Sequence, residues 1–309
     1  MGAARDQMKP THLILLIVMN ILWAGSYASF KVLSPHLDAG AIATLRFGIA
    51  ALALLPFWRL LPGSAPRGGD WWKTIAMGLI VFVLAPRLQV AGVQRGQAGD
   101  AAVLMALEPL ITSVAAAIFL QEHIGPRRWL GFSLGLLGVV VMAQVWRPDF
   151  RLPGLVANSL FVSSFFCEAA YSVLGKPLIA RAGLLKVLAV ALLTGAVVNG
   201  VIDGRQTFWS LQGLPAGAWC LIAYLSIICT LIGYVVWFVV IRETEVNVTA
   251  LTVFIQPVVG VVIATVALKE SLRWGQLWGS LAIVTGLVIA LSRHIKLPGK
   301  RGDSEVAER

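Results

Sequence analysis

The stretch Ala102-Val-Leu-Met-Ala-Leu-Glu-Pro109 has a counterpart 148 residues later, Ala250-Leu-Thr-Val-Phe-Ile-Gln-Pro257. At the same offset an acid and two glycines also align, as the pairs Glu122/Glu270, Gly131/Gly279 and Gly138/Gly286. Weak internal repetition of this kind in an apolar chain is typical of membrane transporters, which bind substrate between two repeats near the middle of the bilayer. The repeat therefore predicts a membrane protein built from two homologous halves.

The composition fits a membrane protein with many spans. Hydrophobic residues make up 58% of the chain and charged residues 13%, whereas a typical soluble domain has about 25% charged residues. A helix needs roughly 20 mainly apolar residues to cross the hydrocarbon. The chain holds ten such runs, at 12–30, 39–57, 72–94, 99–120, 127–146, 153–175, 184–202, 215–240, 247–268 and 274–292. We therefore predict an all-α integral membrane protein with ten transmembrane helices.

The repeat also predicts how these helices are arranged. We expect one five-helix repeat over residues 12–146 and a second over residues 153–292, followed by a polar cytoplasmic tail at 293–309. Because each half has an odd number of spans, the second half must be inverted relative to the first. Two inverted repeats of this kind are expected to surround a central cavity.

The net charge of +10 is explained by where the basic residues fall. In the ten-span topology most Lys and Arg residues lie on the side of the N-terminus, among them Arg127 and Arg128 in the turn after the fourth span. This bias follows the positive-inside rule and predicts that both termini are cytoplasmic. Membrane topology thus accounts for the charge, and we expect no nucleic-acid partner.

The repeated residues resemble those of the EamA family of the drug/metabolite transporter superfamily. The matching positions, in chain order, are Trp23-Ala-Gly-Ser26, Arg46-Phe47, Pro109, Glu122, Gly131, Gly138, Tyr171, Lys176, Pro257, Glu270, Gly279 and Gly286. The resemblance implies a ten-helix transporter with inverted five-helix repeats, a central cavity, and export or exchange of small metabolites. Glu168 departs from the pattern, since an aromatic residue is expected there, and the seventh span has no partner for Arg46-Phe47.

Ionisable side chains inside the spans are the strongest candidates for a substrate site. Each costs on the order of 2.5–3.5 kcal/mol in the membrane, so they normally face a cavity or a partner. We expect Glu108, Glu168 and Arg46 to contact the substrate, with Arg46 able to grip a carboxylate or phosphate. Glu168 could instead form a structural ion pair with Arg46 or Arg87, and Arg46 a structural pair near the membrane face. The depth of Glu168 also makes the proton a candidate coupling ion.

Pro109 and Pro257 occupy equivalent positions in two spans, each after a polar residue, Glu108 or Gln256. A proline within a helix frees a backbone carbonyl and bends the helix, which membrane proteins tolerate where the backbone lines a cavity or gains a neighbour's hydrogen bond. We therefore interpret both prolines as hinges beside the cavity and Gln256 as a substrate contact. The alternative is that each proline only kinks its helix for packing.

Aromatic residues deep in the spans complete the candidate site. We expect a set of aromatic side chains to shape the pocket, where they could bind an aromatic or cationic solute by stacking and cation–π contact. They are Trp23, Tyr27, Tyr171, Tyr234 and Trp237, of which Trp23 and Trp237 lie deepest. Tryptophans near span ends are more often interface anchors. That role is assigned to Trp71, Trp72, Trp129, Trp146, Trp209, Trp219, Trp274 and Trp278.

Two other features of the repeat are interpreted as structural. Glu122 and Glu270 lie in the tight turns after the fourth and ninth spans, where an acid can cap the N-terminus of the next helix. Small-residue faces for close helix packing are formed by the glycine pairs Gly131/Gly135 and Gly275/Gly279.

No catalytic residue, cofactor site or metal site is expected, because no histidine has metal-ligand spacing and no nucleophile stands beside a base. We therefore predict no enzyme, but a secondary transporter in the cell inner (plasma) membrane. It would export or exchange a small metabolite, such as an amino acid, an amino-acid-like or a drug-like solute, by alternating access. The alternative is a non-transporting membrane component, either an assembly subunit or a lipid-handling partner. The oligomeric state is left open.

Overall fold

A computed structural model describes residues 8–95, 107–146, 155–259, 262 and 274–292 of the chain. These residues form helices joined by short turns, with no strand among them. The all-α class predicted from the sequence is therefore confirmed for this part of the chain. The predicted tail at 293–309 lies outside the described residues, as do parts of the expected spans 99–120, 153–175 and 247–268.

The helices of the first half are α1 (Pro10–Leu33), α2 (Ala39–Leu54), η1 (Leu55–Phe57), α3 (Gly69–Leu79), η2 (Ile80–Leu84), α4 (Ala85–Arg95), α6 (Leu107–Phe119) and α7 (Pro126–Ala143). Those of the second half are α8 (Leu155–Arg181), α9 (Leu184–Ser210), α10 (Ala216–Ala223), η3 (Tyr224–Ile232), α11 (Gly233–Glu243), α12 (Val246–Leu251), η4 (Thr252–Phe254) and α14 (Trp274–Leu291). In α3–η2–α4 and in α10–η3–α11 a π-helical stretch interrupts a continuous helix.

Local sequence signals account for where several helices begin. α1 and α7 begin at Pro10 and Pro126, because the fixed φ and missing N–H of proline suit the first helical position. α2 begins after Asp38, whose side chain accepts a hydrogen bond from a first-turn backbone N–H at 2.7 Å, as a good N-cap does. α8 and α9 run on to Arg181 and Ser210, past the ends expected at 175 and 202, because the helix continues into polar residues beyond each apolar run.

Several helices have the length and composition of membrane spans. Among the described residues, five segments are long and apolar enough to cross a membrane, namely Ala39–Phe57, Gly69–Gln89, Leu184–Ser210, Ala216–Glu243 and Trp274–Leu291. Three shorter apolar helices are Pro10–Ser26, Leu107–Phe119 and Val246–Val259. Large apolar side chains on the outer surface, such as Leu52 (67% exposed) and Val201 (81% exposed), suit contact with lipid more than with water. The chain thus has the character of a membrane protein.

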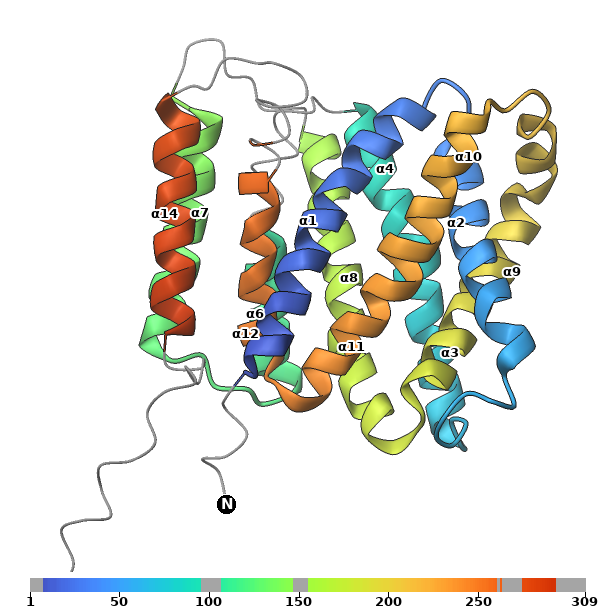
Figure 1. Cartoon of the computed structure of the whole chain (residues 1–309), viewed down its shortest axis with the longest axis horizontal. Coiled ribbons are helices and arrows are strands. Elements are labelled where there is room, and N and C mark those ends of the chain that lie inside the picture. The colour runs from blue at the N-terminus through green and yellow to red at the C-terminus, as the bar shows by residue number, and fades with distance from the viewer. Residues whose placement is uncertain (1–7, 96–106, 147–154, 260–261, 263–273, 293–309) are drawn as a thin grey trace, which may run out of the picture.

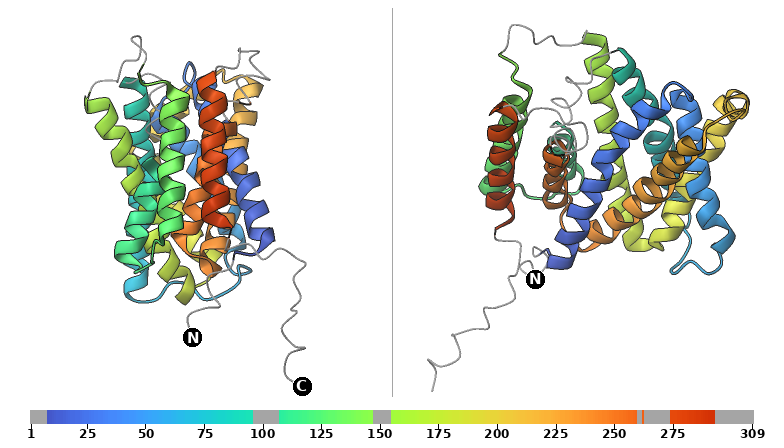
Figure 2. Two further views of the ribbon diagram at one scale, coloured as in Figure 1. Left: turned by 90° about the vertical axis from the view of Figure 1, so that its left-hand side faces the viewer. Right: turned by 45° about the horizontal axis from the view of Figure 1, so that its top comes forward.

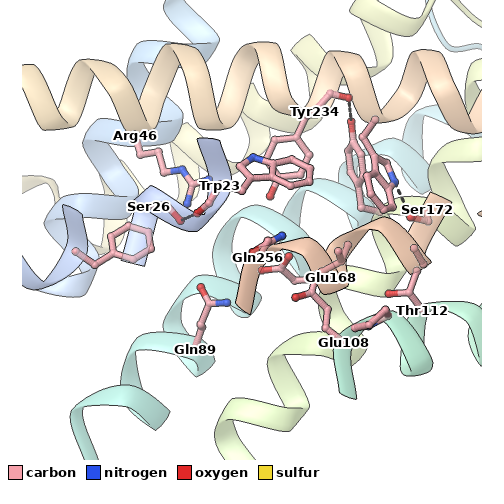
Figure 3. Close-up of a pocket in the computed structure, with 16 residues that line it drawn as sticks. Trp23, Ser26, Arg46, Gln89, Glu108, Thr112, Glu168, Ser172, Tyr234 and Gln256 are labelled. Carbon is pink, nitrogen blue, oxygen red and sulfur yellow. Dashed lines mark hydrogen bonds between the residues drawn. The ribbon is translucent and has the colours of Figure 1, made fainter. Parts of the chain in front are cut away.

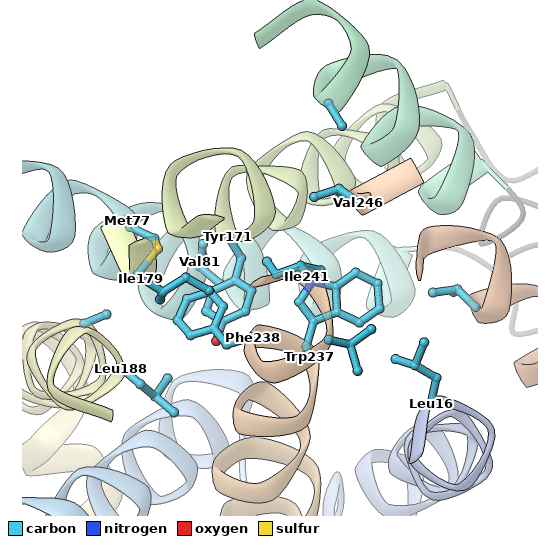
Figure 4. Packing of buried hydrophobic residues seen from close by; sticks show 14 of the residues in the cluster. Leu16, Met77, Val81, Tyr171, Ile179, Leu188, Trp237, Phe238, Ile241 and Val246 are labelled. Atoms are coloured by element: carbon cyan, nitrogen blue, oxygen red, sulfur yellow. The ribbon is translucent and has the colours of Figure 1, made fainter. Parts of the chain in front are cut away.

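Helices from the two halves pack against each other in pairs. α7 and α14 lie side by side at one edge of the molecule, set apart from most other helices (Figure 1), and the same pair is seen from two further directions in Figure 2. In the larger group α2 packs on α9, α4 on α8, and α6 on both α8 and α12. The apolar core of this group includes the ring of Tyr171, stacked on that of Phe238 with centroids 4.1 Å apart (Figure 4).

Glycines allow the close approach of α7 and α14. A Cβ on Gly138 would lie 2.6 Å from the carbonyl oxygen of Gly279, and one on Gly286 would lie 3.0 Å from the carbonyl oxygen of Gly131. Small residues at such an interface let two helix backbones approach closely. The packing role expected for Gly131 and Gly279 is therefore confirmed, with glycines of one repeat facing those of the other.

The Gly138→Ala substitution is expected to destabilise the protein by about 1–3 kcal/mol, because the added methyl group meets a backbone carbonyl that cannot move aside. Gly204 in α9 is the matched control, since nothing lies within 4 Å of a Cβ built there. Gly204→Ala should be neutral or stabilising by up to about 1 kcal/mol. Thermal unfolding in detergent measures both variants, and equal unfolding midpoints would contradict the packing argument.

Candidate functional site

A cavity of about 90 Å³ lies inside the larger helix group, between elements of both halves of the chain. This volume is several times the roughly 10–15 Å³ that one water molecule needs on the same measure. The cavity is lined (Figure 3) by Trp23, Ser26, Phe30, Arg46, Gln89, Glu108, Pro109, Thr112, Glu168, Tyr171, Ser172, Tyr234, Trp237, Ala250, Val253 and Gln256. α1, α2, α4 and α6 thus meet α8, α11, α12 and the residues after it around one space.

The structure brings the residues predicted to contact substrate together at this cavity. They come from six different helical segments and are Trp23, Arg46, Glu108, Glu168, Tyr171, Trp237 and Gln256. Of the two predicted hinges, Pro109 lines the cavity, whereas Pro257 is not among the lining residues. Their shared location is a structural finding; substrate contact and hinge motion stay predictions.

Arg46 is held at the cavity by neighbours from both halves. Its Nε donates a hydrogen bond to Oγ1 of Thr230 at 2.5 Å, and its guanidinium carbon lies 5.3 Å from the ring centroid of Phe47 and 5.9 Å from that of Phe30. Within the described residues it forms no ion pair. The charge of Arg46 is therefore positioned by a hydroxyl and two aromatic faces. The N–H groups of its two terminal nitrogens can donate hydrogen bonds to a ligand.

The π-helical segment η3 orients two of these side chains. Trp23 Nε1 donates to the backbone carbonyl of Cys229 at 2.8 Å, one residue before the Thr230 hydroxyl that holds Arg46. The hydroxyl of Tyr224, at the start of η3, donates to the backbone carbonyl of Leu22 on α1. π-Helical turns inside α-helices occur frequently at functional sites. Here η3 joins α1 and α2 to the second half at the cavity wall.

The two carboxylates of the site, Glu108 and Glu168, face the same cavity and are close enough to interact electrostatically (Figure 3). Neither makes a hydrogen bond or ion pair within the described residues. Arg87, one of the structural partners considered for Glu168, instead pairs with Asp203 of α9 and donates to Asn199 Oδ1 at 2.9 Å. Both carboxylates thus keep their acceptors for a ligand.

Aromatic rings form a continuous wall on the other side of the carboxylates. The ring of Trp23 lies 5.9 Å from that of Trp237 and 6.3 Å from that of Tyr234. Tyr234 in turn packs edge-on against Tyr171 with centroids 4.7 Å apart. Two polar groups of this wall are already used, because Tyr171 Oη donates to the backbone carbonyl of Tyr234 at 3.0 Å and Trp237 Nε1 to Ser172 Oγ at 2.9 Å. The Tyr234 hydroxyl has no hydrogen-bond partner within the described residues. The wall therefore offers apolar ring surface and one hydroxyl group to a solute.

The sequence analysis missed several lining residues. Those not predicted to line the pocket are Ser26, Phe30, Gln89, Thr112, Ser172, Ala250 and Val253. Helical spacing could have found some of them, because residues three or four apart share a helix face. Thr112 follows Glu108 by four residues, and Ser26 follows Trp23 by three. Gln89 has no such signal, because the residues three and four positions away are Ala85, Pro86, Gly92 and Val93.

A buried ion cluster occupies one end of the bundle, where α1 begins and the α6–α7 and α11–α12 turns lie (Figure 1). Its members are Glu122, Arg128, Lys176, Glu245 and Asn247. The Glu122 carboxylate accepts hydrogen bonds from Lys176 Nζ at 2.8 Å, from Asn247 Nδ2 at 2.9 Å, and from two first-turn backbone N–H groups of α12 at 2.9 and 3.0 Å. Arg128 pairs with Glu245 and donates to Asn247 Oδ1 at 2.7 Å.

This ion cluster corrects one expectation about Glu122 and lies close to the cavity. Glu122 caps α12 of the other half, not α7, which follows it in the chain, because its turn folds against the second half. The side chains of Glu122 and Arg128 are only 6% and 8% exposed. Ser172 lines the cavity, and Lys176 of the cluster follows it by one helical turn on α8. The cluster therefore lies about one helical turn from the cavity, towards this end of the bundle.

The described residues contain no group of three or more His, Cys, Asp or Glu side chains that could hold a metal ion. The described cysteines Cys167, Cys220 and Cys229 form no disulfide with one another.

Comparison with known proteins agrees with the geometry. The model of the EamA-like transporter family matches residues 11–144 and again residues 155–292. An uncharacterized transporter of Archaeoglobus fulgidus is 23% identical over 92% of this chain and 98% of its own length. A probable amino-acid metabolite efflux pump of Salmonella typhimurium is 24% identical (91% and 94% covered), and a probable terminal-alkyne amino-acid exporter of Streptantibioticus cattleyicolor 22% identical (93% and 97% covered). One solved crystal structure superposes with a TM-score of 0.74 at 15% identity, covering 93% of this chain and 98% of that one, and shows the same fold.

Proposed function

Because this chain belongs to the EamA-like transporter family, we propose that it is a secondary transporter of the cell inner membrane. In this proposal it exports or exchanges a small metabolite by alternating access, with both termini in the cytoplasm. One observation carries the proposal: a cavity between the two halves holds a cation and two carboxylates without ion-pair partners in the described residues, and an ion cluster lies between helices of both halves towards one end of the bundle.

The packing of the helices supports two inverted five-helix repeats, with ten spans in all. At the 148-residue offset α7 corresponds to α14, and the two pack together. The equivalent helices α2 and α9 also pack together, and α6 packs on α12, which begins the span equivalent to that of α6. The contact of α4 with α8 has its counterpart in that of α1 with α11. The π-helical segment η2 falls at residues equivalent to 228–232, within η3. This exchange of contacts is what a twofold relation between halves produces.

The charges around the cavity favour a zwitterionic solute, such as an amino acid or an amino-acid-like metabolite. Arg46 can bind a carboxylate, and Glu108 and Glu168 can bind an ammonium group, each by charge-assisted hydrogen bonds. The wall formed by Trp23 and Tyr234 can pack against an apolar side chain. Two of the relatives are named a probable terminal-alkyne amino-acid exporter and a probable amino-acid metabolite efflux pump, which agrees with this substrate class.

Solute counterflow in proteoliposomes tests the proposal. Vesicles preloaded with unlabelled amino acids and organic cations should take up the same labelled solutes faster than empty vesicles or vesicles without protein. Imposing a proton gradient on the same vesicles tests proton coupling. A transport rate that does not change with the gradient would rule out the proton as coupling ion. If no solute shows counterflow, the transport proposal fails, and a non-transporting assembly or lipid-handling role becomes the better account.

A further inference from the structure

Asn20 lies on α1 behind the cavity wall and is completely buried. Its Nδ2 donates to the backbone carbonyl of Leu16 at 2.8 Å and to Oγ1 of Thr252 at 3.1 Å. Its Oδ1 accepts a hydrogen bond from Nε2 of Gln256 at 2.9 Å. Asn20 is not among the lining residues, whereas Gln256 is. The buried Asn20 side chain therefore holds, by a hydrogen bond, the Gln256 side chain that lines the cavity.

Two backbone carbonyls determine the direction of these hydrogen bonds. The carbonyl of Leu16 can only accept, so the Asn20 atom that faces it must be the amide nitrogen. The hydroxyl of Thr252 donates its single proton to the carbonyl of Thr249 at 2.7 Å, so towards Asn20 it can only accept. The oxygen of Asn20 is then the atom left for Gln256, which must offer its NH₂ group.

The direction of this hydrogen bond leaves the carbonyl oxygen of Gln256 available to a ligand. One N–H of its Nε2 is used by Asn20, and its Oε1 has no hydrogen-bond partner within the described part of the chain. Gln256 lies beside Glu168 and Glu108 in Figure 3. Apart from the second N–H of Gln256, these three side chains carry only acceptors when both carboxylates are ionised.

We propose that Asn20 is a positioning residue that makes the cavity selective for a substrate ammonium group, by holding Gln256 as a hydrogen-bond acceptor beside Glu108 and Glu168. The inference rests on the proposed transport of a zwitterionic solute. Without Asn20 the amide of Gln256 is free to turn its NH₂ group into the cavity. The NH₂ group would then donate to a carboxylate and so compete with the substrate ammonium group. It would also place a donor opposite the ammonium group, which is itself a donor.

The competing explanation is that Asn20 only joins α1 to η4 through interhelical hydrogen bonds, as polar residues do in membrane helices. The two explanations differ in one measurable quantity. A structural role affects binding of every ligand alike, whereas a positioning role changes the preference between a ligand with an ammonium group and one without it.

The test measures binding of labelled L-leucine and of labelled 4-methylpentanoate, which lacks only the ammonium group, to the purified full-length protein. We expect the wild-type protein to prefer L-leucine. Asn20→Leu should reduce the ratio of the two affinities by at least about 10-fold, the effect of one hydrogen bond to a charged group. Asn20→Asp in its protonated form keeps an acceptor for Gln256 Nε2 and a donor for the carbonyl of Leu16, and should retain the preference.

Thr252→Val is the matched control, because it removes one partner of Asn20 while the carbonyl of Leu16 still fixes the amide. Its affinity ratio should equal that of the wild type. Size-exclusion elution verifies that every variant is folded. An affinity ratio in Asn20→Leu equal to that of the wild type overturns the proposal. Equal binding of both probes by the wild-type protein also overturns the proposal. If the wild-type protein binds neither probe, the zwitterionic substrate class on which the inference rests is rejected.

Discussion

Glutamine in place of Glu168 is expected to lower the rate of solute counterflow by about 10- to 100-fold, the cost of losing a hydrogen bond between charged groups. The carboxylate faces the cavity and has no ion-pair partner within the described residues. Glutamine keeps the size of the side chain and removes its charge. The loss therefore reports on contact with a cationic group of the solute rather than on packing.

Glu243→Gln is the matched control for this prediction. Glu243 is the same residue type on the same chain, but it forms an exposed pair with Lys9, in which the two side chains are 48% and 63% exposed. An exposed pair contributes at most about 1 kcal/mol, so counterflow should be unchanged. Counterflow in Glu168→Gln that equals the wild-type rate would leave the protein a transporter and assign Glu168 to packing.

Removing the carboxylate of Glu122 should have the largest effect on stability. Glu122→Ala removes the acceptor of four hydrogen bonds, one of which is donated by the ammonium group of Lys176. Breaking a buried ion pair on one side leaves the other charge and the freed N–H groups unsatisfied, at a cost on the order of 3 kcal/mol. The thermal unfolding midpoint in detergent should therefore fall clearly, while that of Glu243→Gln should barely change. Equal midpoints would show that the ion cluster contributes little.

The same substitution should open the cavity towards the end of the bundle where α1 begins. A cysteine at Thr112, in a chain with Cys167, Cys220 and Cys229 changed to serine, reports on access to the cavity. A membrane-impermeant maleimide added on the N-terminal side should label it slowly when Glu122 is present and faster in Glu122→Ala. Labelling that is equally slow in both proteins would mean that the ion cluster is not the barrier on this side.

The sequence predicted much of the candidate site because burying charge in a membrane is costly. Arg46, Glu108 and Glu168 lie in the middle of apolar runs, and such residues must face a cavity or a partner. That reasoning needs no knowledge of which helices are neighbours. It found three charged residues that now share one cavity, and the repeat added Gln256 as the equivalent of Glu108.

The partners of these residues could not be predicted, because they come from distant parts of the chain. Thr230 holds Arg46, and Asn20 holds Gln256, although no pattern in the sequence links either pair. Glu122 was expected to cap the following helix and caps α12 instead. A turn residue reveals its chemistry in the sequence, but its partner depends on which helix end the fold places beside it.

The sequence by itself determined the helical class, the apolar runs, the repeat and the charges that had to avoid lipid, because hydropathy and the cost of burying charge act on each segment alone. Only the tertiary structure decided that α7 and α14 pack together through glycines, that Arg87 pairs with Asp203, and that Asn20 sets the direction of the Gln256 amide. These choices depend on contacts a few ångströms long between segments far apart in the chain. Hydrogen-bond direction and close packing are properties of such contacts, so they exist only once the helices have come together.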